Sequence, residues 1–285
     1  GYERAEKYVS GSPSKPFIQC EYSHSMGNSG GGFKEYWDLT RKYPSYQGGF
    51  IWDFVDQGLR KKGVNGAEIF AYGGDFNIYD PNDQNFCVNG LISPDRVPNP
   101  HMYEVGHIHQ PIWTTPVDLE KGEVNIYNEN FFTDLSGYYM EWQLLADGKV
   151  IQAGVVNDLK VAPQQTVKVK LDIRKESFLE DKELLLNVTY KLKQADLLLP
   201  AGFAVAKNQL ALRSYKAPEL TIRNAIQANQ VTGVPVIKDN DRSFLIIQGD
   251  EFVLNFNRRN GFLCRYQVEG NELIHEGGQL TPNFW

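Results

Sequence analysis

The chain has 285 residues, of which 41% are hydrophobic and 22% are charged. This balance favours folded cores over disorder, and the length predicts about two or three domains. The formal net charge is −6 and no large cluster of lysine and arginine occurs, which argues against nucleic acid and acidic membrane surfaces as partners. No apolar run approaches the roughly 18 residues of a membrane-spanning helix.

Three cysteines, Cys20, Cys87 and Cys264, are widely spaced and odd in number. This spacing disfavours a disulfide framework and a zinc site, and it leaves the compartment open. The chain begins at Gly1 without a methionine or a visible signal peptide. We therefore expect a fragment or a processed piece of a soluble protein, either cytoplasmic or periplasmic.

The first predicted strand follows a polar segment, residues 1–15, that ends in a Ser/Gly/Pro turn. Residues 17–20 form a short, mostly apolar run after Pro16, which is typical of a buried strand. Glu21 then stands at the carboxyl end of that strand, where barrel enzymes place catalytic groups. A carboxylate is costly to bury without a partner, so Glu21 is the first candidate for a functional residue.

A helix and a second strand come next. Apolar side chains recur through residues 33–39 and predict a helix that ends before Pro44. Residues 48–55 are mostly apolar and predict a second buried strand. A strand, a helix and a strand within about 40 residues indicate two parallel strands with a right-handed crossover. This is one unit of a repeating β/α fold.

Residues 58–100 are rich in aromatic and polar side chains and show no regular apolar pattern. Loops of this length are usually functional or disordered, and the many aromatic residues favour an ordered, functional loop. Residues 100–110 predict a closing helix.

The character changes to antiparallel β structure between residues 111 and 215. Apolar and polar side chains alternate at residues 138–145 and 167–171, and Asp147-Gly148 predicts a hairpin turn. Roughly seven strands in about 100 residues suggest an immunoglobulin-like sandwich.

A third, β-rich piece follows a predicted linker that begins at residue 217. Its strands are predicted near residues 244–247, 252–256 and 262–266, and Asn260-Gly261 is a strong hairpin signal. A few strands are a marginal fold on their own, so this piece reads as the beginning of a further domain.

Four segments together resemble glycoside hydrolase family 2. CEYSHSMGNS at residues 20–29 resembles the nucleophile signature of that family, and QGGFIWDFVDQ at residues 47–57 resembles its next barrel strand. YGGDF at residues 72–76 and FCVNGL at residues 86–91 continue the resemblance. The order of the later β-rich parts favours the large bacterial-type β-galactosidases over shorter β-glucuronidase-like relatives.

The resemblance implies a multidomain protein that combines α/β and all-β parts. Residues 1–110 would be the C-terminal part of a (β/α)8 TIM-barrel catalytic domain, and residues 111–216 an immunoglobulin-like β-sandwich. Residues 217–285 would be a linker and the start of a C-terminal β-sandwich domain. Two strands cannot close a barrel that needs eight, so we expect the isolated chain to be inactive.

By resemblance, Glu21 is the nucleophile of a retaining glycosidase and forms a covalent galactosyl-enzyme. Retention requires a second carboxyl group about 5–5.5 Å away as acid/base. In the family that group follows an asparagine at an earlier barrel strand. Asn128-Glu129 is such a pair, but it lies in the predicted sandwich and is interpreted as a coincidence. The acid/base is therefore expected outside this chain.

The resemblance also assigns His24, Trp52 and Asn89 to substrate binding. His24 would hydrogen-bond galactose hydroxyls, and Trp52 would lie under the sugar ring. The backbone carbonyl of Phe86 and the side-chain oxygen of Asn89 would bind sodium, while magnesium ligands would lie outside this chain. The structural alternatives are a turn-capping histidine, a core tryptophan and an ordinary loop turn.

The predicted function is hydrolysis of terminal β-D-galactosides such as lactose. The alternatives are a β-glucuronidase or β-mannosidase relative, and a non-catalytic carbohydrate-binding or assembly module. The implied partners are the β-galactoside substrate, the remainder of the catalytic domain and further copies in a homo-oligomer. Neither nucleic acid nor a membrane is expected as a partner.

Overall fold

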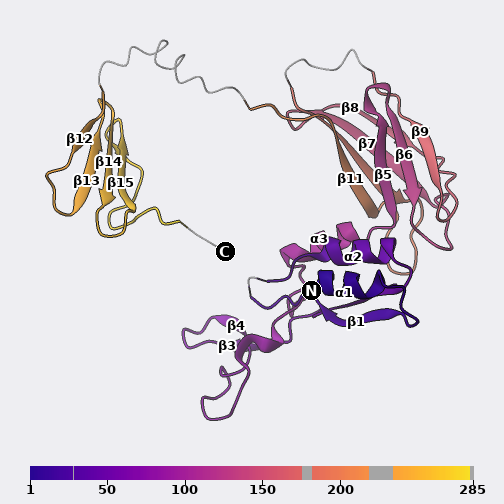
Figure 1. Cartoon of the computed structure of the whole chain (residues 1–285), viewed down its shortest axis with the longest axis horizontal. Helices are drawn as coiled ribbons and strands as arrows, with labels where there is room; N and C mark the ends of the chain where they lie inside the picture. Colours follow the sequence, from indigo (N-terminus) through magenta and orange to yellow (C-terminus); the bar gives the residue numbers. More distant parts are fainter. Residues whose placement is uncertain (28, 175–181, 218–233, 283–285) are drawn as a thin grey trace. The chain divides into compact units, whose positions relative to one another are not determined.

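The computed structural model describes residues 1–27, 29–174, 182–217 and 234–282. The chain forms two compact units, Gly1–Lys216 and Ala217–Trp285 (Figure 1). Most of the linker predicted after residue 216 falls on residues 218–233, which lie outside the described residues. Among the described helices, none is long and apolar enough to cross a membrane.

The first unit begins with an α/β part in which a helix joins two parallel strands. Strand β1 pairs with β2 in parallel, and the connecting helix α2 packs against β2. This confirms the predicted strand–helix–strand unit and the closing helix. The elements are α1 (Tyr2–Val9), β1 (Phe17–Tyr22), α2 (Phe33–Lys42), β2 (Tyr46–Ile51) and α3 (Pro100–Ile108).

Helix α2 supports the carboxyl end of β1. Gly32, just before the helix, has a φ of 67°, a left-handed conformation that glycine adopts with little strain. Arg41 in the last turn complements the negative end of the helix dipole. Phe33 is buried in one cluster with Tyr22, the residue after Glu21. The helix therefore contacts the strand end that carries the candidate nucleophile.

The α/β part differs from its sequence prediction in two ways. Residues 2–9, described from the sequence only as polar, form helix α1, in which Ala5 and Val9 lie one turn apart and are buried in a shared cluster. Strands β1 and β2 are not buried as predicted, since Ile18 is 60% and Phe50 is 65% exposed. A sheet of two strands leaves apolar side chains on its uncovered face in contact with solvent.

Residues 58–100, predicted as one long loop, contain an antiparallel hairpin. Strand β3 (Leu59–Lys62) pairs with β4 (Glu68–Ala71), and a short 3-10 helix, η1 (Gln84–Cys87), follows. Figure 1 shows the hairpin extending away from helices α1 to α3. The prediction missed it because β3 reads LRKK, which lacks the alternation of apolar and polar residues that marks a strand.

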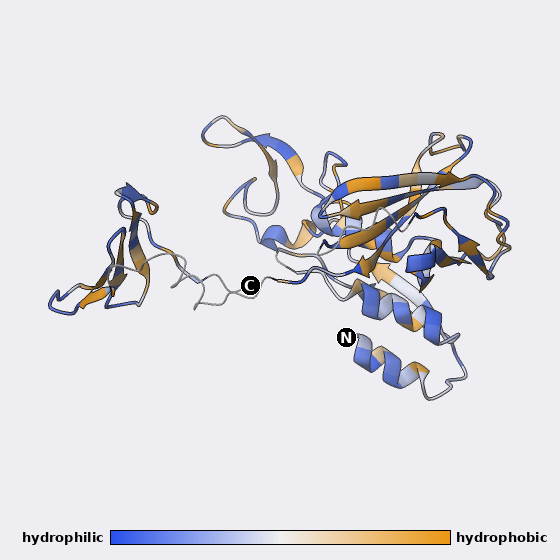
Figure 2. Ribbon diagram, turned by 90° about the horizontal axis from the view of Figure 1, so that it is seen from above, coloured by the Kyte–Doolittle hydropathy of each residue, from blue (hydrophilic) through white to orange (hydrophobic). Residues whose placement is uncertain are grey.

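Two antiparallel sheets form the second part of the first unit. One has the order β5-β6-β9 and the other β11-β10-β7-β8. The predicted hairpin joins β7 to β8 through Asp147 and Gly148, whose φ angles are 45° and 77°. Hydrophobic residues dominate the strands in Figure 2. The elements are β5 (Ile112–Asp118), η2 (Leu119–Lys121), β6 (Glu123–Asn128), β7 (Tyr138–Ala146), β8 (Lys149–Val156), β9 (Thr166–Lys170), β10 (Leu184–Leu192) and β11 (Ala204–Arg213).

The core of this sandwich is closed. Ile112, Val124 and Leu144 are each 0% exposed and belong to one cluster that both sheets share. A hydrogen bond of 2.6 Å joins Thr114 Oγ1 in one sheet to the Tyr190 hydroxyl in the other. Burial raises the pKa of the Tyr190 hydroxyl more than the Thr114 bond lowers it, so the phenol stays neutral.

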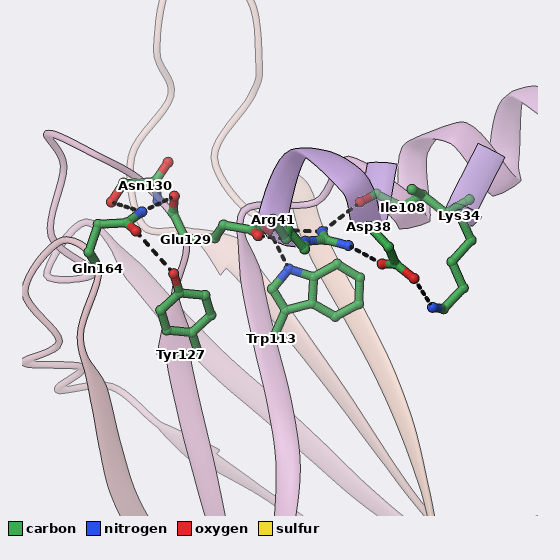
Figure 3. A network of polar contacts seen from close by, with 9 residues as sticks. All are labelled: Lys34, Asp38, Arg41, Ile108, Trp113, Tyr127, Glu129, Asn130 and Gln164. Atoms are coloured by element: carbon green, nitrogen blue, oxygen red, sulfur yellow. Dashed lines mark hydrogen bonds and ion pairs between the residues drawn. The ribbon is translucent and has the colours of Figure 1, made fainter. Parts of the chain in front are cut away.

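An ion pair fastens the sandwich to the α/β part (Figure 3). Arg41 donates from Nε and Nη2 to the two carboxylate oxygens of Glu129, at 2.6 and 2.9 Å. Its guanidinium lies 4.7 Å from the ring centroid of Trp113, whose Nε1–H donates to Glu129 at 2.7 Å. Burial lowers the pKa of Arg41, but the hydrogen bonds and charges of Glu129 and Asp38 raise it by more, so the net shift is upward. Glu129 therefore has structural partners in both parts, Arg41 on helix α2 and Trp113 on β5.

The second unit is an antiparallel meander of five strands, in the order β12-β13-β14-β15-β16. The predicted Asn260-Gly261 turn joins β14 to β15, and Gly261 has a φ of 75°. Within residues 234–282 no side chain is buried, which fits a sheet whose faces are largely open. The strands are β12 (Val236–Lys238), β13 (Phe244–Gln248), β14 (Phe252–Asn257), β15 (Leu263–Val268) and β16 (Asn271–Glu272).

Candidate active site

The candidate site lies where β1 and β2 end. Glu21 is the penultimate residue of β1, and Trp52 directly follows β2. The Trp52 amide donates to the Tyr22 carbonyl at 3.3 Å, and the Ser25 amide donates to the Trp52 carbonyl at 3.0 Å. These bonds hold the turn after Glu21 beside the end of the second strand.

Glu21 and His24 are in direct contact. His24 Nδ1 lies 2.5 Å from Glu21 Oε1, and the two side chains are 29% and 43% exposed. An ionised carboxylate only accepts hydrogen bonds, so Nδ1 carries the proton and Nε2 of a neutral ring is an acceptor. Nε2 is buried and finds no hydrogen-bond partner among the described residues. The arrangement leaves Nε2 of His24 without a hydrogen-bond donor among the described residues.

Two aromatic side chains flank His24. Its ring centroid lies 6.4 Å from that of Trp52 and 5.8 Å from that of Phe86. Trp52 is 38% and Phe86 is 50% exposed, so both present apolar surface next to the Glu21–His24 pair. The structure thus brings Glu21, His24, Trp52 and Phe86 to one place, although Phe86 comes from a distant segment.

Asn89 lies behind Phe86. It is 0% exposed, and its Nδ2 donates to the Phe86 backbone carbonyl. Its Oδ1 is buried and has no hydrogen-bond partner among the described residues. Hard cations prefer carbonyl and amide oxygens, but Nδ2 of Asn89, not Oδ1, faces the Phe86 carbonyl, so one cation could bind both oxygens only with the Asn89 amide turned over. Among described side chains, no group of three His, Cys, Asp or Glu residues could hold a metal.

Sequence reasoning missed the residues that hold this loop against the end of β2. The Asp53 amide donates to the Asn89 carbonyl at 2.9 Å, and Asp56 Oδ1 accepts from the Gly90 amide at 2.7 Å. Gly90 has no substitute here, because a Cβ would lie 2.1 Å from the Asp56 nitrogen. The sequence did contain a signal for Asp53 and Asp56, because both follow a parallel strand, and the same kind of position identified Glu21.

Comparison with known proteins gives matches over both parts of the first unit. Residues 2–114 match the model described as "Glycosyl hydrolases family 2, TIM barrel domain". Residues 124–213 match the model described as "Beta-galactosidase, domain 4".

Several curated relatives carry the name beta-galactosidase. One from Priestia megaterium (strain DSM 319 / IMG 1521) is 37% identical over 98% of this chain, and one from Halalkalibacterium halodurans is 38% identical over 98%. One from Clostridium acetobutylicum is 42% identical over 73% of this chain. The chain spans 26%, 26% and 22% of these relatives, so it corresponds to about a quarter of their length. The sequence, with its strand–helix–strand unit and the residues gathered at its end, belongs to glycosyl hydrolase family 2.

Proposed function

We propose that this chain carries the nucleophile side of the active site of a retaining β-galactosidase. The observation that carries the proposal is the Glu21 carboxylate at the carboxyl end of β1, 2.5 Å from His24 and beside Trp52. The names of the relatives favour a galactoside over a glucuronide or a mannoside as the substrate.

In the proposed reaction, an ionised Glu21 attacks the anomeric carbon of a β-galactoside and forms a covalent glycosyl-enzyme. The aglycone leaves with a proton from a second carboxyl group, and water then attacks the same carbon with that group acting as base. Glu129 is not a candidate for this role, because both of its carboxylate oxygens bind Arg41 of helix α2. We propose that the acid/base comes from outside this chain.

The neighbours of Glu21 would bind the sugar. His24 Nε2, as an acceptor, suits a sugar hydroxyl, and its Nδ1–H keeps the Glu21 carboxylate oriented. The partly exposed indole of Trp52 suits the C–H face of a pyranose ring. With the Asn89 amide turned so that Oδ1 replaces Nδ2 beside the Phe86 carbonyl, these two oxygens would hold a sodium ion, whose positive charge would orient a sugar hydroxyl.

The same proposal covers the sandwich. The strand orders β5-β6-β9 and β11-β10-β7-β8 support an immunoglobulin-like topology, with two sheets around one core. Its ion pair with Arg41 suggests that it braces the barrel part through helix α2.

The test is to trap the glycosyl-enzyme in the full-length protein that carries this chain. A 2-deoxy-2-fluoro-β-galactoside with a good leaving group should label the peptide containing Glu21, as read by mass spectrometry. Glu21→Gln should abolish labelling and turnover, whereas Glu35→Gln, an exposed residue on helix α2, should keep both. Label on another residue, or turnover by Glu21→Gln, would refute the assignment.

The alternative functions are separated by the choice of substrate. Faster turnover of a chromogenic β-glucuronide or β-mannoside than of the β-galactoside would move the protein to another specificity. Galactose binding by calorimetry, with no turnover of any of the three substrates, would favour a binding module.

A further inference from the structure

The turn after Glu21 is shaped by its serines. Ser23 Oγ donates to the Gly31 carbonyl at 2.8 Å, and Ser29 Oγ donates to the carbonyls of His24 and Met26 at 2.8 and 2.6 Å. Hydroxyl groups that bond nearby carbonyls in this way replace the regular backbone pairing that a turn lacks. The conformation of His24 therefore depends on these local bonds.

Ser25 differs from the other two serines because it is buried. It is 6% exposed, and its Oγ donates to the Ser23 carbonyl at 3.0 Å. Its amide donates to the Trp52 carbonyl at 3.0 Å, while the Trp52 amide donates to the Tyr22 carbonyl at 3.3 Å. Ser25 thus joins the turn that carries His24 to the residue proposed as the sugar platform.

Gly30 closes over Ser25 from the opposite side of the turn. A Cβ on Gly30 would lie 2.6 Å from Ser25 Oγ and 3.3 Å from Ser25 Cα. Gly27, in the same turn, also has a positive φ, 62° against 82° for Gly30, but a Cβ there would meet nothing within 4 Å. The two glycines share a similar backbone requirement and differ in whether a methyl group would push on Ser25.

We propose that Ser25 is a positioning residue, which holds His24 and Trp52 in register with Glu21 through its amide bond to Trp52 and its contact with Gly30. The proposal rests on the proposed function of this site. Because a misplacement of about 1 Å can slow catalysis about 100-fold, a small displacement of Ser25 is enough to be measured.

The test compares Gly30→Ala with Gly27→Ala in the full-length protein. Both variants place alanine at positive φ, 62° at Gly27 and 82° at Gly30, and comparison at matched melting temperatures corrects for the difference in backbone strain. We expect Gly30→Ala to lower kcat/KM for a chromogenic β-galactoside at least about tenfold below Gly27→Ala, at matched melting temperatures. The rate of glycosyl-enzyme formation in a single turnover should fall by the same factor.

A second comparison isolates the contact itself. Ser25→Ala removes Oγ, the nearest atom to the added methyl group, and leaves the amide bond to Trp52 in place. By itself it should lower kcat/KM less than Gly30→Ala does, because the amide bond to Trp52 remains. The double variant should have a kcat/KM at least about three times that of Gly30→Ala alone. Should Gly30→Ala fail to fold, Ser25→Thr is the substitute. It adds a methyl group to Ser25 beside Gly30, and we expect it to lower kcat/KM by a similar factor.

Equal kcat/KM for Gly30→Ala and Gly27→Ala would overturn the proposal, as would a double variant no better than Gly30→Ala. These results are distinguishable from failure of the proposed function. If the wild-type protein is not labelled on Glu21, the function fails. If the wild type is labelled and Gly30→Ala is labelled at the rate of Gly27→Ala, only the role of Ser25 fails.

Discussion

The sandwich and the α/β part of the first unit differ in how completely they bury their apolar side chains. In the sandwich, Ile112, Val124 and Leu144 are fully shielded, because both sheets that cover them belong to this chain. In the α/β part, Ile18 and Phe54 are each 60% exposed, although they lie in or next to strands. The part that carries the candidate site is therefore the less completely packed one.

This difference shows where the stability of the first unit comes from. Removing apolar surface from water is the main favourable term in folding, and the sandwich does so more completely. The α/β part has two parallel strands, whereas a TIM barrel has eight. We expect the α/β part to depend on packing partners, of which the sandwich is one.

The largest expected loss of stability comes from truncating a side chain in the sandwich core rather than on the open face of β2. Leu144→Ala should reduce the free energy of unfolding by about 3 kcal/mol, because it leaves a cavity between two closed sheets. Phe50→Ala, on the open face of β2, should change it by no more than about 0.5 kcal/mol. Urea denaturation followed by circular dichroism measures both, and similar losses would mean that the face of β2 is covered in solution.

The next effect concerns the contact between the two parts. Arg41→Ala should reduce the free energy of unfolding by about 2 kcal/mol, since it leaves the Glu129 carboxylate without its bidentate partner. Glu129→Gln should reduce it by less, and the double variant should lose less than the sum of the two. A double-mutant cycle measures this coupling, and additive losses would show that the pair does not join the parts.

A smaller effect is expected within the sandwich. Tyr190→Phe should reduce the free energy of unfolding by about 1 kcal/mol, because Thr114 Oγ1 loses its partner inside the core. Thr114→Val alone leaves the buried Tyr190 hydroxyl without a hydrogen-bond partner, so it should reduce the free energy of unfolding by at least as much. Adding Thr114→Val to Tyr190→Phe should recover stability in thermal melts. A further loss in the double variant would contradict a role for this hydrogen bond.

The smallest effect is a pH dependence at the contact between the parts. Burial, and then the charge of Arg41, lower the pKa of His109, whose ring lies 4.1 Å from that of Trp37. Between its folded and unfolded pKa values the unfolded chain binds more protons, so stability falls as the pH drops below the ordinary value of about 6.5. Urea midpoints at about pH 7.5 and 5.5 should show this slope, and His109→Phe should reduce it. An unchanged slope in His109→Phe would assign the effect to other groups.

Local patterns predicted those elements whose cause is local. Helix α2 and strands β7 and β9 follow from apolar spacing and from the residues that end them. Helix α1 was missed because its two buried residues gain their shielding only after α2 and β2 pack against them. The hairpin β3–β4 was missed because β3 has one apolar residue followed by three charged ones, which gives no alternation.

For the candidate site, the contact of Glu21 with His24 was within reach of the sequence, because the two residues are only three positions apart. The contact of Ser25 with Trp52 was not, because it depends on the parallel pairing of β1 and β2 and on the path of the turn between them. The burial of Asn89 likewise depends on how a distant loop folds back on the end of β2.

The sequence by itself determined the family, the strand–helix–strand unit, the alternating strands of the sandwich and the residue types available for chemistry. These follow from motifs and periodicities that are read along the chain. Only the tertiary structure decided that Glu129 binds Arg41, that Ser25 bonds to Trp52 and that the Asn89 carbonyl accepts from the Asp53 amide. Such contacts join residues whose separation along the chain sets no distance in space, so they exist only once sheets and helices have packed.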